Sequence, residues 1–93
     1  MPLSRAEIAT PSAEKLVNRL CKHWEHKLEV TREGREARIQ FEEGLCLLHA
    51  EPETLVVAIE TLEEDSLDQL EGVVGRHLER MAGDEELVIV WEN

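Results

Sequence analysis

Basic residues, long apolar runs and cysteines are all scarce in this 93-residue sequence. Ten lysines and arginines stand against 21 aspartates and glutamates, which gives a net charge of −11. A chain of this sign repels nucleic-acid phosphates and anionic lipid head groups, so we expect neither nucleic acid nor a membrane as its partner. A membrane-spanning helix needs a run of about 18 apolar residues, which the sequence lacks, and residues 1–5 do not resemble the apolar core of a signal peptide. We therefore expect a cytoplasmic protein.

The length and the cysteine content limit the fold further. A chain of 93 residues is expected to form a single domain, residues 1–93, with a small hydrophobic core. Its two cysteines, Cys21 and Cys46, lie far apart in the sequence, and a disulfide-stabilised mini-protein would normally contain more of them. We expect both thiols to be reduced.

Two segments have the apolar spacing of amphipathic helices. The apolar positions of the first are Ala13, Leu16, Val17, Leu20, Cys21 and Trp24. Thr10 is its expected N-cap, with Pro11 at the first helical position. The apolar positions of the second are Leu67, Leu70, Val74, Leu78 and Met81. Ser66 and Gln69 form a predicted capping box at its start, and Gly83 is expected directly after its end.

The other segments alternate between apolar and polar residues or are continuously apolar, as β-strands are. The predicted strands are residues 5–10, 27–31, 37–41, 45–50, 55–62 and 87–91. Gly34 lies in the turn between the second and third of these, which predicts a hairpin. Segments 45–50 and 55–62 are apolar on nearly both faces, which is typical of central strands or of a sheet face covered by a second subunit.

These elements together predict an α+β fold. The expected order is β-α-β-β-β-β-α-β, with two helices packed on one face of a mainly antiparallel sheet of about six strands. A ferredoxin-like arrangement with extra strands is the main alternative. The apolar segments of the sheet also make a homodimer through the sheet plausible.

Histidines and basic residues gather in the C-terminal part of both predicted helices. The group comprises Lys22, His23, His26, Lys27, Arg76, His77 and Arg80. On an otherwise acidic chain, such a group can attract an anionic small ligand or a carboxylate of a partner protein. The alternative is that these cations only complement the negative ends of the helix dipoles, at roughly 0.3–1 kcal/mol each.

The same elements resemble a known family. The residues concerned are Leu20-Cys21-Lys22-His23-Trp24 with His26-Lys27, then Gly44, Cys46 and Ala50, then Arg76-His77-Leu78-Glu79-Arg80, and a last segment from Glu86-Leu87 to Trp91. Together they resemble a small bacterial family catalogued as domain of unknown function 2218. The resemblance implies a link to iron or siderophore metabolism, because some members are associated with siderophore-interacting flavoprotein reductases. It therefore implies such a flavoprotein as a partner.

Three of the histidines raise a second hypothesis, a metal site. His23 and His26 are three residues apart on the expected helix and can share a zinc or iron ion. The further ligand would be His77 or a carboxylate such as Glu25 or Glu79. The competing interpretation is that His23 and His77 are helix-flank residues hydrogen-bonded to the backbone, and that both cysteines are small core residues. Both interpretations remain open on the sequence.

Catalysis is the weakest of the functional classes considered. Cys21 lies in the middle of a predicted helix, where no helix N-terminus lowers its pKa, and Cys46 lies in a predicted central strand. We therefore expect a non-catalytic domain that binds a small ligand or a protein. The alternative is a metal-binding protein that uses His23, His26 and His77.

Overall fold

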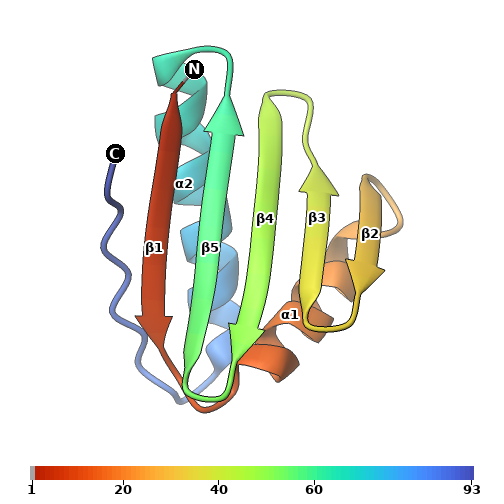
Figure 1. Cartoon of the computed structure of the whole chain (residues 1–93), viewed down its shortest axis with the longest axis vertical. Coiled ribbons are helices and arrows are strands. Elements are labelled where there is room, and N and C mark those ends of the chain that lie inside the picture. Colours follow the sequence, from red (N-terminus) through yellow and green to blue (C-terminus); the bar gives the residue numbers. More distant parts are fainter. Residues whose placement is uncertain (1) are drawn as a thin grey trace.

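The chain folds into two layers, a five-stranded sheet and two helices that cover one of its faces (Figure 1). The computed structural model describes residues 2–93. The elements are β1 (Leu3–Ala9), α1 (Ala13–Trp24), β2 (Glu29–Glu33), β3 (Glu36–Gln40), β4 (Gly44–Glu51), β5 (Thr54–Thr61) and α2 (Glu64–Ala82). The strands are antiparallel, in the spatial order β1-β5-β4-β3-β2. The predicted α+β fold is therefore confirmed, with five strands where about six were expected.

The core lies between the helices and one face of the sheet. In β1, β3, β4 and β5 every second residue is buried, as the period of two of a β-strand requires. The two strands that are apolar on nearly both faces, β4 and β5, are interior strands of the sheet, as predicted. The opposite face is covered by neither helix, and we call it the open face (Figure 1).

Both predicted helices form, and each buries its apolar stripe, but both begin at other residues than expected. Ser12, not Thr10, is the N-cap of α1. The Thr10 hydroxyl instead accepts a hydrogen bond of 3.0 Å from the Ser12 N–H and donates one of 2.6 Å to Glu85. Helix α2 starts at Glu64, before the expected capping box at Ser66, because β5 ends at Thr61 and two acidic residues in the first turn suit the helix dipole.

The predicted last strand, 87–91, is not a strand of the sheet. The segment runs beside β1 in an extended course (Figure 1), but a single bridge joins it to β1, with hydrogen bonds of 2.9 and 2.8 Å between Arg5 and Glu92. Its side chains still alternate: Leu87 is buried, whereas Val88 and Val90 are 72% and 65% exposed. The alternation that predicted a strand reflects burial of every second side chain, which needs no regular ladder of backbone hydrogen bonds.

Neither helix within residues 2–93 has the length and apolar character needed to cross a membrane.

Candidate functional site

His23 and His77, which the sequence places on different helices, lie next to each other where α1 packs on α2. Their ring centroids are 5.0 Å apart. The Trp24 ring packs against both, with centroid distances of 5.6 Å to His23 and 4.8 Å to His77. Phe41, directly after β3, meets Trp24 edge to face at 5.0 Å. The two histidines therefore belong to an aromatic cluster that joins the helices to the sheet.

The hydrogen bond of His77 defines the state of its ring. Nδ1 lies 2.7 Å from the backbone carbonyl oxygen of Val73, one helical turn earlier. Because a carbonyl oxygen only accepts, Nδ1 carries the proton and donates it, and Nε2 is left for other interactions. This is the backbone-bonded helix-flank position that the competing interpretation assigned to His77.

The three-histidine metal site is not formed. His26 lies beyond the end of α1, its side chain is 79% exposed, and its nearest acidic partner is Glu25, with 4.0 Å between Nε2 and Oε1. Residues 2–93 contain no group of three histidine, cysteine, aspartate or glutamate side chains that could hold a metal ion. Helix α1 ends at Trp24, before His26, so the two histidines do not share a regular helix as expected. A metal-binding role for His23, His26 and His77 stays a prediction.

The basic residues of the predicted ligand site lie at the surface. Lys22, Lys27, Arg76 and Arg80 are all exposed. The Arg76 guanidinium lies back along α2, since a Cβ atom at Gly72 would be 3.0 Å from its Nη1 atom. A ligand-binding role for the seven predicted residues stays a prediction, and the structure places the rings of His23 and His77 in contact.

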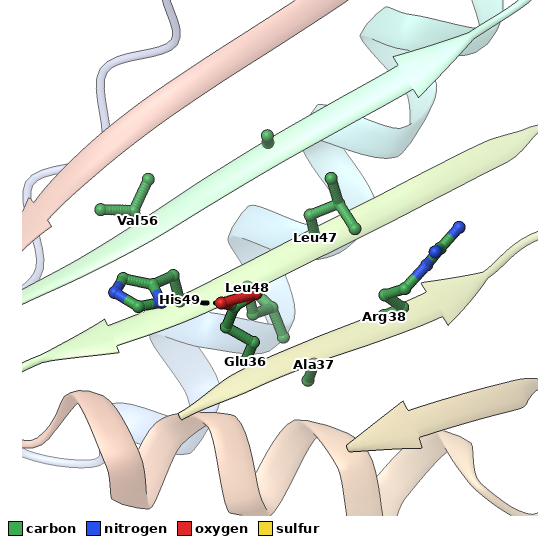
Figure 2. A pocket seen from close by; sticks show the side chains of 8 residues that line it. Glu36, Ala37, Arg38, Leu47, Leu48, His49 and Val56 are labelled. Carbon is green, nitrogen blue, oxygen red and sulfur yellow. Dashed lines mark ion pairs between the residues drawn. The ribbon is translucent and has the colours of Figure 1, made fainter. Parts of the chain in front are cut away.

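The open face has a hollow that sequence reasoning did not identify. It has a volume of about 380 Å³ and lies across β3, β4 and β5. Figure 2 shows Leu47 and His49 on β4, Val56 on β5, and Glu36 and Arg38 on β3 around it. The register places these residues side by side, because His49 pairs with both Glu36 and Val56.

The middle of the open face is apolar. The residues that form this apolar centre are Leu45, Leu47, Val56 and Ala58. Leu47 is 39% exposed, and its paired neighbour on β5 is Ala58. In a two-layer fold only the face turned to the helices needs apolar residues for the core, so an apolar centre on the other face has no role in packing the domain.

Charged residues surround the apolar centre, and most are acidic. The open face carries Glu7, Glu29, Glu33, Glu36, Glu51 and Glu60 against Arg5 and Arg38. His49 lies between two of these carboxylates, with Nδ1 3.9 Å from Glu36 and Nε2 3.8 Å from Glu51. The surface is therefore apolar in the middle and negative at its edges.

Both thiols are buried, and burial raises the pKa of each. On β4, the pKa of Cys46 is raised to about 12 by desolvation, and the neighbouring Cys21 adds to the rise. Burial also raises the pKa of Cys21, and the Arg32 guanidinium partly opposes this. Since the thiolate is the nucleophilic form, neither cysteine is activated at neutral pH.

The signal that could have identified the open-face hollow was present in part. Segments 45–50 and 55–62 have apolar residues at consecutive positions, so that each places apolar side chains on both faces of the sheet. The position of His49 between Glu36 and Glu51 depends on the register of β3 with β4, which the sequence does not state. Only the structure could therefore bring these residues together.

Comparison with known proteins finds a family and a solved relative. The family model described as "Uncharacterized protein conserved in bacteria (DUF2218)" matches residues 5–92. The NMR structure of PA4090 from Pseudomonas aeruginosa is similar to this chain, with 41% sequence identity and a TM-score of 0.84. The similarity covers 99% of this chain and 96% of that one. No curated protein matches the chain. The chain therefore belongs to the DUF2218 family of uncharacterised bacterial proteins.

Proposed function

We propose that this domain is a non-catalytic accessory module that docks onto a partner protein through its open face. The observation that carries the proposal is the apolar centre of Leu45, Leu47, Val56 and Ala58 on the face that the helices leave uncovered. Apolar side chains gathered on an exposed surface and rimmed by polar residues are typical of protein–protein contacts.

The charge of the face selects the kind of partner. Six glutamates and two arginines surround the apolar centre, on a chain of net charge −11. A second copy of the chain would bring like charges together, which costs free energy. We therefore propose a partner surface that is apolar in the middle and carries lysines or arginines around it. The siderophore-interacting flavoprotein implied by the family resemblance is one partner with which to test the proposal.

The first experiment measures binding of a designed probe, a helical peptide with leucine on one face and lysine on the other. The control peptide has the same sequence with glutamate in place of lysine. We expect the lysine peptide alone to bind, and to shift amide NMR signals of β3, β4 and β5. Salt should weaken this binding, because the rim charges are exposed and screened. Equal binding of the two peptides, or signal shifts confined to α1 and α2, would contradict the proposal.

Two leucine variants test the apolar centre. Leu47→Ser removes a side chain from the middle of the open face, and Leu62→Ser removes one that is 80% exposed just beyond β5. We expect the first to weaken binding of the lysine peptide about tenfold, as loss of a central apolar contact does, and the second to leave it unchanged. Similar losses in both variants would mean that the peptide is held by general hydrophobicity.

Two double variants test whether binding requires the acidic residues around the apolar centre. A double variant of the rim, Glu36→Gln with Glu60→Gln, should weaken peptide binding and reduce its dependence on salt. The control, Asp68→Asn with Glu79→Gln, removes the same charge from exposed positions on α2 and should bind as the original chain does. Equal effects would show that net charge, not the rim, attracts the peptide.

Self-association is measured on the same samples by light scattering. A dimer that Leu47→Ser abolishes and Leu62→Ser preserves would identify a second copy as the occupant of the open face. That result would favour the homodimer expected from the sequence and overturn the proposal of a basic partner.

A further inference from the structure

A second pocket lies on the helix side of the molecule, between α1 and the edge strand β2. It has a volume of about 440 Å³ and is lined by Asn18, Arg19, Cys21, Lys22, Glu25 and Arg32. Arg32 reaches it because Arg32 pairs with Ala37, whose side chain is buried toward the helices. The pocket is therefore separate from the open face and from the His23–His77 pair.

The charge of this pocket is opposite to that of the molecule. Three of the ten lysines and arginines line it, against one acidic residue, Glu25. Elsewhere the chain has twenty acids, so the pocket is a local positive site on a negative surface. Such a site concentrates small anions from solution.

Hydrogen bonds hold the two guanidinium groups of the pocket in place. The Nε atom of Arg32 donates to the Gly34 carbonyl oxygen at 2.9 Å, and Nη1 donates to Oδ1 of Asn18 on α1. These bonds use two of the five N–H donors of a guanidinium, and the others can serve an anion. Arg19 is fixed in turn by donation from Nη1 to the carbonyl oxygen of Met81 in the last turn of α2. Side chains fixed in this way lose less entropy when a ligand binds.

The Cys21 side chain, 8% exposed, contributes a small and largely apolar part of the pocket wall. Burial raises the pKa of this thiol and keeps it neutral, so it does not repel an anion. The pocket therefore combines three cations with a neutral, weakly polar group.

We propose that this pocket binds a small organic phosphate monoester. Three cations in one pocket suit a group that carries about two negative charges at neutral pH, and the planar guanidinium of Arg32 can donate two hydrogen bonds to phosphate oxygens. The volume of about 440 Å³ leaves room for an organic part beside the phosphate.

The test is an amide NMR titration of the whole chain with glycerol 3-phosphate and with inorganic phosphate, against sodium chloride at equal ionic strength. We expect saturable shifts at residues 18–25 and at Arg32, with tighter binding of the monoester. Shifts that chloride reproduces, or that never saturate, would overturn the proposal by showing general screening. Equal affinity for the two phosphates would overturn the role of the organic part. A carboxylate such as succinate that binds as tightly as the monoester would overturn the choice of phosphate.

Variants locate the binding. Lys22→Gln and Arg32→Gln each remove a charge from the pocket and should weaken glycerol 3-phosphate binding about fivefold. The matched control is Lys27→Gln, which removes the same charge from an exposed position outside the pocket and should change the affinity less than twofold. Because Arg32→Gln also alters the contact with Asn18, Lys22→Gln decides the outcome: an unchanged affinity in Lys22→Gln, or an equal loss in Lys27→Gln, contradicts the site.

Discussion

The thiol of Cys46 is an ionisable group held at 0% exposure against the helices. Desolvation raises its pKa from the ordinary 9.0 to about 12. Between pH 9 and pH 12 the Cys46 thiol therefore keeps its proton in the folded state and loses the proton in the unfolded state. Its contribution to stability is complete below pH 9 and is lost progressively as the pH rises toward 12.

We predict that the free energy of unfolding falls above pH 9, at up to about 1.4 kcal/mol per pH unit from this residue. Urea denaturation at pH 8, 9, 10 and 11 measures the decline. Cys46→Ala lowers stability at every pH by leaving a cavity, but its decline with pH should be shallower than that of the original chain. Equal slopes for the two proteins would show that other groups cause the alkaline loss.

Individual histidines show how far residue positions could be predicted from the sequence. The contact between His23 and His77 was predictable, because each lies on the flank of an apolar helical stripe and the two helices must pack together. The displacement of His26 was not, since it depends on the helix ending two residues earlier. His49 received no role in the sequence analysis, because its neighbours come from other strands.

At the scale of elements, Gly44 marks a close approach between β4 and β5. A Cβ atom at this position would lie 2.3 Å from the carbonyl oxygen of Glu60 and 2.6 Å from Cγ2 of Thr61. No atom pair can remain at such distances, and the backbone oxygen cannot move without disturbing the strand pair. The two central strands can therefore start their pairing here only with glycine.

We predict that Gly44→Ala destabilises the protein by about 1–3 kcal/mol, because it forces β4 away from β5. Gly75→Ala is the matched control: Gly75 lies inside α2, where a Cβ atom would meet nothing within 4 Å. This second change should stabilise the protein by about 1 kcal/mol, through the higher helix propensity of alanine. Urea denaturation measures the change in the free energy of unfolding for both variants. An unchanged stability in Gly44→Ala would refute the close approach.

The elements that could be predicted are those in which the apolar pattern repeats several times. Both helical stripes and the five strands β1 to β5 are found where the pattern places them, with shifts of a few residues at their ends. The helix starts were missed because neither N-cap, Ser12 or Glu63, makes a side-chain capping hydrogen bond. Segment 87–91 was assigned to the sheet because alternation reports burial and not hydrogen bonding.

At the scale of the whole molecule, acidic residues greatly outnumber basic ones. A net charge of −11 on 93 residues means that folding brings acidic groups closer together than they are in the unfolded chain. This repulsion acts over distances at which salt screens charges effectively. The molecule should therefore be sensitive to ionic strength.

We predict that raising sodium chloride from low concentration to about 0.3 M stabilises the fold by about 1 kcal/mol, or roughly 4–8 °C in Tm. Thermal unfolding followed by circular dichroism measures this. A variant with two fewer charges in the loop after α2, Asp84→Asn with Glu86→Gln, should respond less to salt. A Tm that salt leaves unchanged or lowers would show that ion pairs balance the repulsion.

The division of the molecule into two layers separates the hydrophobic core from the proposed binding face. The core is complete between the helices and one side of the sheet, so substitutions on the open face can change binding without removing core contacts. The candidate site could be predicted only as far as its apolar strands, because its outline depends on the register of three strands.

The two tryptophans lie in different surroundings, Trp24 in the core and Trp91 partly buried against it. Trp24 contacts His23, His77 and Phe41, where both helices meet the sheet, whereas Trp91 lies on the segment that a single bridge holds to β1. Fluorescence of a chain that keeps only Trp24 therefore reports on the junction of the helices with the sheet, and fluorescence of one that keeps only Trp91 reports on the last segment. The protein carries a natural spectroscopic reporter for each of these two regions.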